Sequence, residues 1–378
     1  MSFSLYVHIP FCTSKCSYCD FVSFKYNSSY AAEYLKALEL EIRINSFKKT
    51  YQKQKVNTIF IGGGTPTVLD AKFMEQLFLI LDKYFYLNEL SEFTVEANPG
   101  TLSKQKLEIL KGFGVNRLSI GVQAYQKKLL DILGRAHTYE QVVKSFEYAH
   151  EVGIKNINAD LIFGIPTQLL SEWELSLKRT LELNPKHIAC YSLQLENDTS
   201  LFERIKKKAI EKCSEELELA MYNIAIEILT DNGYMHYEIS NFSKYNYQSK
   251  HNLCYWHNDD YMGIGLAAHS HLNGIRYSNT DNFSEYLHKL SNNTLPIIEQ
   301  NILSKKEIMS ETLFMGLRLI KGINLNEFYK KFGVHVTDVW PKQIKKLTKE
   351  GLVLITNQHL RLTEKGIPVA NVVFREFV

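Results

Sequence analysis

The 378-residue chain lacks any long uninterrupted run of apolar residues. No stretch reaches the roughly 18 residues that a membrane-spanning helix needs, so no spanning helix is expected. The N-terminal sequence MSFSLYVHIP has neither a basic segment nor a long apolar segment, which disfavours a signal peptide. The sequence therefore predicts a cytoplasmic protein.

An excess of charge of one sign is also missing. The chain has 44 Lys and Arg against 41 Asp and Glu, a formal net charge of +3. This near balance disfavours a general polyanion binder, so we expect no nucleic-acid partner. Hydrophobic residues make up 45% of the chain and charged residues 22%, which predicts a folded chain with one large domain and a smaller one.

The chain has few cysteines, and half of them lie in one cluster. Three of the six cysteines follow the spacing C-x3-C-x2-C, namely Cys12, Cys16 and Cys19. The other three are isolated, namely Cys190, Cys213 and Cys254. In a reducing compartment such a cluster more often binds metal than forms disulfides. Zinc sites usually add a second cysteine pair or a later histidine pair. Three thiolates on a four-iron cube would leave one iron open to a small molecule. A zinc-stapled interaction protein is the alternative.

Short β-rich runs alternate with helical patterns through the first two thirds of the chain. The expected strands cover residues 4–10, 56–64, 92–99, 117–123, 157–166 and 187–195. The expected helices cover residues 28–47, 70–87, 103–112, 126–133, 138–152, 172–183 and 214–231, with Asp70 as an N-cap. This α/β pattern predicts a parallel sheet, open or curled into a (β/α)6 partial barrel.

Several polar or glycine-rich segments stand at or near the carboxyl ends of the expected strands. Ligands of such sheets bind beyond those ends. The segments and residues are Cys12–Cys19, Gly62–Thr65, Glu96, Gln123 and Asp160. We therefore expect all of them to face one rim of the sheet.

The alternation fades after about residue 235. We expect a core over residues 1–235, an extension rich in Tyr, Asn and His over 236–290 that carries HNLCYW, and a smaller C-terminal domain over 291–378. Residues 286–303 show weak periodicity and suggest a linker.

The C-terminal part has a different pattern. A helix is expected to end at Gly322, Asn324 and Glu327 resemble a capping box, and a further helix should span about 341–351. The segment LVLITNQHLRLT then suggests a hairpin. Helices followed by a hairpin predict a winged-helix-like α+β domain. The near-neutral charge argues against DNA binding by it.

The cysteine spacing resembles the motif of the radical S-adenosylmethionine superfamily. GGGTPT, residues 62–67, fits as a second element, because glycines after a strand let the backbone approach a ligand closely. In that superfamily the amine and carboxylate of S-adenosylmethionine chelate the fourth iron of a 4Fe–4S cluster. An electron then cleaves the sulfonium to give a 5′-deoxyadenosyl radical. The resemblance implies that Cys12, Cys16 and Cys19 bind the cluster.

A closer resemblance is carried by YVHIPFC, CSYCDF, GGGTPT, EANP, GVQ, LGRAH and ADLIFGIP. These phrases are similar, in the same order, to the oxygen-independent coproporphyrinogen III oxidase family, and HNLCYW and GIGLAAHS extend the match to about residue 270. The resemblance implies that S-adenosylmethionine is bound by Tyr6, Tyr18, Gly63, Gly64, Thr65, Glu96, Gln123, Arg135 and Asp160. In the oxidase the positions of Gln123, Arg135 and Asp160 hold a second S-adenosylmethionine.

Two branches of this family differ near the cysteines. The oxidase has a fourth cysteine where this chain has Phe21, and an extension ahead of its first strand. The other branch lacks the fourth cysteine and the extension, carries an H-N-x-x-Y-W motif, and consists of haem chaperones. The segment HNLCYW of this chain matches that motif. The resemblance implies haem as cargo, haem-accepting respiratory proteins as partners, and a reductant such as flavodoxin or ferredoxin. Coproporphyrinogen III dehydrogenation is the alternative, so whether the chain is an enzyme is left open.

The HNLCYW motif supplies the expected haem residues. His251 could be an axial ligand, and Tyr255 and Trp256 could stack on the porphyrin. Arg or Lys side chains could meet the propionates. Other candidate ligands are Cys254, His257, His269 and His271, although isolated histidines are more often structural. A homodimer and a peripheral membrane contact are left open.

Overall fold

A twelve-stranded sheet organises the computed structural model, which describes residues 3–46 and 53–378. Its order is β14-β13-β12-β11-β1-β4-β5-β6-β7-β8-β10-β9. The six expected strands form its parallel centre: β1 (Phe3–Ile9), β4 (Val56–Gly63), β5 (Glu92–Ala97), β6 (Arg117–Gln123), β7 (Asn156–Phe163) and β8 (His187–Ser192). The predicted α/β core is therefore confirmed.

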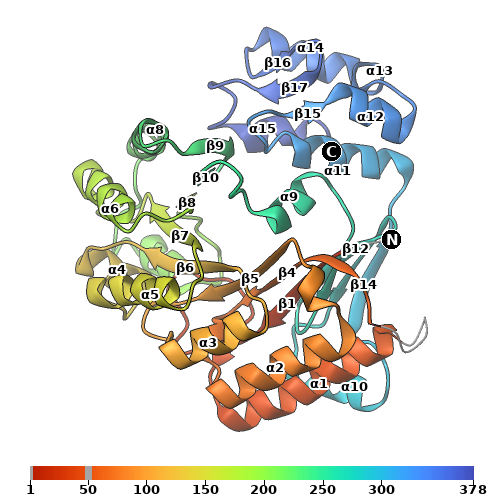
Figure 1. The fold of residues 1–378 in the computed structure, drawn as a ribbon. Helices are drawn as coiled ribbons and strands as arrows, with labels where there is room; N and C mark the ends of the chain where they lie inside the picture. The colour runs from red at the N-terminus through yellow and green to blue at the C-terminus, as the bar shows by residue number, and fades with distance from the viewer. Residues whose placement is uncertain (1–2, 47–52) are drawn as a thin grey trace.

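Helices cover the outer side of this curved sheet (Figure 1). They are α1 (Ser28–Ser46), α2 (Ala71–Tyr84), α3 (Lys104–Gly112), α4 (Lys127–Leu133), α5 (Tyr139–Glu151), α6 (Leu170–Glu182) and α8 (Glu215–Asp231). Helix α7 (Ser200–Lys206) instead contacts the segment after β1, where the N–H of Leu201 donates to the Ser17 carbonyl. The apolar face expected on α1 is buried, from Ala31 through Leu38 to Ile42. Asp70 precedes α2, but its carboxylate accepts a hydrogen bond from the Tyr26 hydroxyl at 2.7 Å instead of capping the helix backbone.

The chain after residue 234 extends both edges of the sheet. At one edge β9 (Met235–Glu238) and β10 (Asn241–Ser243) pair antiparallel next to β8. Helix α9 (Lys250–Trp256) then carries HNLCYW toward the other edge. There β11 (Tyr261–Ile264) pairs parallel with β1, followed by antiparallel β12 (His269–Leu272), β13 (Ile275–Asn279) and β14 (Ile297–Ile302).

The expectation of a linker over residues 286–303 was wrong. Helix α10 (Phe283–Ser291) packs on α1, where Tyr286 stacks on Tyr34 with ring centroids 5.4 Å apart. Strand β14 pairs with β13, and most of its residues are exposed. An exposed edge strand has no buried face, so it leaves no apolar alternation in the sequence.

The C-terminal part forms the expected winged-helix-like unit. It contains α11 (Lys305–Gly316), β15 (Ile323–Asn324), α12 (Leu325–Phe332), α13 (Val336–Val339), α14 (Pro341–Lys349), β16 (Val353–Ile355), β17 (His359–Leu362) and α15 (Ala370–Arg375). Strands β15, β17 and β16 form a three-stranded sheet over a separate apolar core that includes Leu313, Phe328 and Trp340.

Helix α11 ends at Gly316, not at Gly322 as the sequence suggested. The residues that follow pair with β9 instead. Leu319 forms a bridge to Glu238, and the N–H of Ile239 donates to the carbonyl of Arg318 at 3.1 Å. A tertiary strand-like pairing has therefore replaced the last helical turn, and it ties the C-terminal domain to the core.

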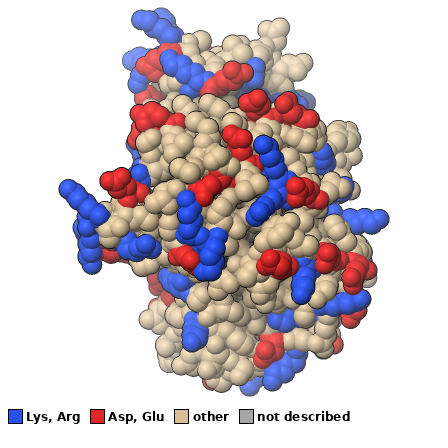
Figure 2. All heavy atoms as spheres, turned by 90° about the vertical axis from the view of Figure 1, so that its left-hand side faces the viewer, with Lys and Arg blue, Asp and Glu red and all other residues tan. Residues whose placement is uncertain are grey.

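One face of the molecule shows the mixture of charges expected from the balanced composition. Figure 2 shows Lys and Arg interspersed with Asp and Glu over one face of the molecule, without a broad field of one sign. Among the described residues, no helix combines the length and apolar content needed to cross a membrane.

Candidate functional site

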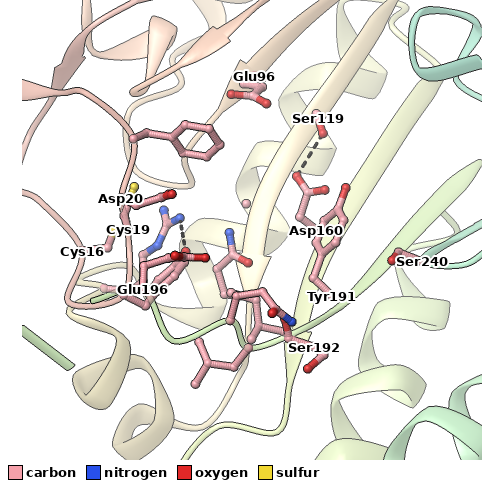
Figure 3. Close-up of a pocket in the computed structure, with 18 of the residues that line it drawn as sticks. Cys16, Cys19, Asp20, Glu96, Ser119, Asp160, Tyr191, Ser192, Glu196 and Ser240 are labelled. Atoms are coloured by element: carbon pink, nitrogen blue, oxygen red, sulfur yellow. Dashed lines mark hydrogen bonds between the residues drawn. The ribbon is translucent and has the colours of Figure 1, made fainter. Parts of the chain in front are cut away.

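The three clustered cysteines line a cavity of about 880 Å³ at the carboxyl ends of the parallel strands (Figure 3). The loop that carries them leaves β2 (Phe11–Cys12), which pairs with β3 (Phe24–Lys25). The N–H of Tyr26 donates to the Cys12 carbonyl at 2.8 Å, which closes the loop. All of these thiols are free in the structure. The chain thus presents the cysteines from one closed loop beside the sheet.

The LGRAH segment anchors the middle of the cysteine loop. The N–H of Ser17 donates to the Leu133 carbonyl at 3.0 Å, where α4 ends. Gly134 follows with φ +71°, and a Cβ there would lie 3.0 Å from the Ser17 nitrogen. Glycine is required at this position by both the left-handed backbone and the close approach of the loop.

The glycine motif is tied to the strand that leads into the cysteines. The N–H of Gly64 donates to the Ile9 carbonyl at 3.0 Å, and the N–H of Thr65 donates to the Phe11 carbonyl at 2.7 Å. Gly63 has φ +104°, and a side chain there would overlap the His8 ring. Gly63, Gly64 and Thr65 all line the cavity. The motif therefore leaves a cradle of bare backbone beside the thiols.

Arg135 lies against the cysteine loop. Its Nη2 donates to the Tyr18 hydroxyl at 2.9 Å. Burial raises the pKa of the Cys16 thiol, while the Arg135 guanidinium opposes that rise. Burial also raises the pKa of Cys19 to about 11. A bound metal centre would have to keep these thiolates deprotonated, and Arg135 already favours the thiolate at Cys16.

Two carboxyl groups face the cavity from β5 and β7. Glu96 accepts a hydrogen bond from the Gly63 N–H at 3.2 Å, and its pKa rises to about 8 because of burial and then of the nearby Asp160. Asp160 accepts hydrogen bonds from Ser119 at 2.9 Å and from Asn158 at 2.8 Å. Burial raises the pKa of Asp160, and these bonds oppose the rise. Both groups are suited to a cationic or hydroxyl-bearing ligand.

Gln123 ends β6 with φ 63° and also lines the cavity. Gly121 precedes it on the same face, and a Cβ there would lie 2.8 Å from the Gln123 amide nitrogen. The structure thus gathers the rim residues that the sequence suggested. Tyr6 differs, because its side chain lines a second cavity.

Other residues of the large cavity were missed in the sequence. Asn98 belongs to the EANP phrase, and Ser119 lies two residues before Gly121 on β6, so the two face the same side of the strand. The sequence therefore held a local signal for both Asn98 and Ser119. Tyr191 and Ser192 stand at the end of β8. No local pattern points to the residues that come from the turn between β9 and β10 and from the C-terminal domain, namely Ile239, Ser240, Arg318, Ile367, Pro368, Ala370 and Asn371.

A second cavity of about 470 Å³ adjoins the first and shares Asp20 and Phe21 with it. Its wall is aromatic, with Tyr6, Tyr255, Trp256 and Tyr261 beside Phe21, and it also contains His8, His269, Arg276 and Met315. Phe21, which is 59% exposed, occupies the position of the oxidase's fourth cysteine. The HNLCYW segment thus contributes one wall of a cavity next to the cysteine loop.

His251 lies behind this wall and is only 1% exposed. Its Nδ1 is hydrogen bonded to the Thr58 hydroxyl at 2.8 Å, and its Nε2 to the Tyr255 hydroxyl at 2.8 Å. Burial, and then Arg117, lowers its pKa to about 3. Iron coordination by His251 would require one of these bonds to break, and it stays a prediction.

The remaining candidates are dispersed. Cys254 is buried and its thiol contacts the Asp260 carbonyl at 3.7 Å, His257 is exposed outside the cavity, and His271 is buried. Within residues 3–46 and 53–378, no group of three or more His, Cys, Asp or Glu side chains is arranged to hold a single metal ion.

Comparisons with known proteins agree with this geometry. A family model described as the Radical SAM superfamily matches residues 6–179, and the HemN C-terminal domain matches residues 303–369. The chain is 39% identical to the heme chaperone HemW of Bacillus subtilis over 99% of both chains. It is 38% identical to HemW of Lactococcus lactis, over 99% of this chain and 97% of that one.

Among solved structures, coproporphyrinogen III oxidase (HemN) from Escherichia coli superimposes with a TM-score of 0.86 at 24% identity. The match covers 100% of this chain and 90% of that one. At this identity the likeness establishes the fold: a HemN-like radical S-adenosylmethionine core with its C-terminal domain.

Proposed function

The chain belongs to the HemW family, and we propose that it is a haem chaperone that binds haem beside an iron–sulfur centre and passes it to haem-requiring respiratory proteins. The observation that carries this proposal is the aromatic cavity next to the cysteine loop. A porphyrin is a broad aromatic ligand, and flat aromatic side chains provide the contact area that it needs.

The large cavity fits a 4Fe–4S cluster with S-adenosylmethionine. Cys12, Cys16 and Cys19 would supply three thiolate ligands, and the glycine motif leaves space that a side chain would fill. Three buried polar atoms of cavity-lining residues have no hydrogen-bond partner in the described part of the chain: Asn98 Oδ1, Arg135 Nε and Arg318 Nε. Orphaned buried polar groups are costly, so they favour a polar ligand there.

Each residue has a role that follows from its position. When bound, the cluster and S-adenosylmethionine supply one-electron chemistry at the sulfonium. Glu96 accepts hydrogen bonds from the ligand, Arg135 stabilises the Cys16 thiolate, and Tyr18 holds the Arg135 guanidinium. Ile367, Pro368 and Ala370 cover the cavity from the C-terminal domain and limit the entry of water.

The second cavity would hold the haem. Tyr255 and Trp256 line it, and His251 supports Tyr255 from behind. The indole N–H of Trp256 is buried without a partner among the described residues, and the Arg318 guanidinium lies 4.4 Å from the centre of its ring. A carboxylate such as a haem propionate could satisfy this N–H. Arg276 lines this cavity but is already paired with Glu311 at 2.6 Å. Arg318 lines the adjoining large cavity, so a propionate would meet it at the border between the two cavities.

A haem titration of the cluster-reconstituted protein under anaerobic conditions tests the proposal. We expect saturable binding with a change in the Soret band, and weaker binding by Trp256→Ala. Tyr191→Ala is the matched control, because Tyr191 lines only the large cavity. Loss of haem binding by Tyr191→Ala, with Trp256→Ala unchanged, would place haem in the wrong cavity for this proposal.

An enzymatic function is the second candidate. The large cavity extends past the residues matched to S-adenosylmethionine, to Ser192, Glu218 and Asn371, and so has room for a substrate. An anaerobic assay with coproporphyrinogen III, S-adenosylmethionine and a reductant tests it. Formation of protoporphyrinogen would favour the dehydrogenase over the chaperone.

The delivery step involves partners that we propose from the family alone. These are haem-accepting respiratory proteins and a reductant such as flavodoxin or ferredoxin, with the chain in the cytoplasm. Transfer of bound haem to a haem-depleted b-type protein, followed by its absorption spectrum, is the assay for this step.

A further inference from the structure

We propose that His269 supplies an axial ligand to haem iron in the aromatic cavity, and that His251 is a positioning residue that orients Tyr255. This inference rests on the proposed haem-binding function. It names the side chain that meets the iron and assigns a different role to the histidine of the HNLCYW motif.

Most iron-binding side chains of the cavity are already engaged. His8 is buried, with Nδ1 bonded to the Tyr6 hydroxyl and Nε2 to the Val22 carbonyl, both at 3.0 Å. The Tyr255 hydroxyl bonds to His251, and the Tyr261 hydroxyl accepts from Arg276 at 3.3 Å. Burial also raises the pKa of Tyr255 well above its usual range, which disfavours a phenolate ligand.

His269 differs from these residues. It lines the cavity and is exposed, and its ring makes no hydrogen bond or ion pair with any residue that the structure describes. A neutral imidazole with an accessible nitrogen is the commonest protein ligand for metals and a frequent haem ligand. His269 therefore offers iron a nitrogen without the loss of an existing contact.

The backbone of His269 is held firmly. It begins β12 and pairs with Ser278 of β13, and a side chain on the facing Gly263 would overlap the His269 carbonyl. The turn before it contains Ala267 in the left-handed region at φ 56°, where a non-glycine residue is strained. Ala267 also lines the cavity. A free imidazole on a fixed strand end is pre-organised for a ligand.

The hydrogen bonds of His251 assign it the other role. Thr58 donates its hydroxyl proton to Ser4 at 2.9 Å, so the His251 Nδ1–H must donate to Thr58. A neutral imidazole then accepts at Nε2, and the Tyr255 hydroxyl is the donor.

The start of α9 fixes the backbone of His251. The Glu92 carboxylate accepts hydrogen bonds from the N–H groups of Lys250 at 2.9 Å and His251 at 3.1 Å. His251 is therefore held rigidly, one turn before the aromatic residue that it orients.

Titration of the full-length, cluster-reconstituted chain with ferric haem tests both roles. We expect His269→Ala to lower haem affinity by at least about tenfold, because loss of groups that only orient metal ligands already costs that much. The Soret band and the electron paramagnetic resonance spectrum should change, and added imidazole should restore them. His257→Ala, another exposed histidine outside the cavity, should match the parent chain.

His251→Gln separates a positioning role from ligation. We expect weaker haem binding with the parent's resonance spectrum, since the iron ligand is unchanged. An altered spectrum for His251→Gln beside an unaltered one for His269→Ala would make His251 the ligand and overturn the inference. Unchanged affinity and spectrum for His269→Ala would also overturn it, while haem binding itself would stand. Absence of haem binding by the parent chain would instead remove the proposed function.

Discussion

Glu96 provides the sharpest test of the proposed cofactor site, because two roles of its side chain predict opposite effects of one substitution. Glu96→Gln keeps the size of the side chain and removes its charge. The carboxyl accepts a hydrogen bond from the Gly63 N–H, and a Cβ on Gly62 would lie 2.8 Å from it, so the space around it is fixed. The amide oxygen of glutamine can accept the same bond.

The stability effect follows from the pKa of Glu96, which is raised from 4.5 to about 8 by burial and Asp160. At pH 7 this carboxyl is protonated in the folded chain and ionised in the unfolded chain. Each pH unit above the pKa that Glu96 has in the unfolded chain then lowers the free energy of unfolding by about 1.4 kcal/mol. The total loss at pH 7 is up to about 3 kcal/mol. The contribution of Glu96 to the stability of the parent chain is therefore most favourable at a pH below its pKa in the unfolded chain. This contribution is lost as the pH rises to its pKa in the folded chain. Glu96→Gln lacks this loss and should be more stable near neutral pH.

The ligand effect has the opposite sign. If S-adenosylmethionine binds the ionised form of Glu96, its cationic group must draw the proton from this carboxyl, and glutamine cannot supply the resulting charge. Glu96→Gln should then cost about 1.5 to 3 kcal/mol of binding free energy, or roughly 10- to 150-fold in affinity. Denaturant unfolding of the cluster-free chain at several pH values measures the first effect. Anaerobic calorimetry with the reconstituted protein measures the second.

Glu92→Gln is the matched control on the same strand. Glu92 accepts hydrogen bonds from two N–H groups at the start of α9. Its substitution should therefore lower the stability of the chain and leave the affinity for S-adenosylmethionine unchanged. The reasoning fails if Glu96→Gln behaves like this control, because Glu96 would then belong to a structural polar network.

Three further substitutions test other parts of the site. Gly63→Ala forces alanine into φ +104° against the His8 ring and should cost at least about 2 kcal/mol in denaturant unfolding, whereas Gly112→Ala, in open space, should cost nothing. Cys12→Ala should abolish labile sulfide and bound iron after reconstitution, while Cys254→Ala should retain both, since Cys254 lies outside the large cavity. Arg135→Lys loses the planar fork beside Tyr18 and should weaken S-adenosylmethionine binding by about tenfold in calorimetry; Arg179→Lys on the outer helix α6 should not.

The parallel core could be predicted because its strands are buried on both faces and are punctuated by glycine and proline. The rim residues could be predicted for a related reason: carboxyl ends of parallel strands meet at one edge, so Glu96, Gln123 and Asp160 follow from strand positions alone.

The structural features that the sequence did not predict depend on contacts between residues far apart in the chain. No local pattern says that β11 pairs with β1, or that Leu319 leaves its helix to pair with Glu238. The aromatic cavity is assembled from Tyr6, Phe21, the 255–276 segment and Met315, and its shape exists only after those pieces meet. The sequence named His251 through its motif, but the engagement of both ring nitrogens depends on Thr58 and Tyr255 in the folded chain.

The place of β1 in the sheet has a consequence for biosynthesis. It carries the cysteine loop, yet one of its neighbours is β11, which ends at Ile264. The loop itself is held by Leu133 and by the N–H of Leu201, which donates to the Ser17 carbonyl at 2.8 Å. During translation the first strand therefore keeps an open edge until more than two thirds of the chain has left the ribosome. Such late pairing slows folding and leaves the edge accessible to other chains. Loading of the proposed iron–sulfur cluster should accordingly require residue 201 to have left the ribosome, and nascent chains truncated before residue 201 should not retain a cluster.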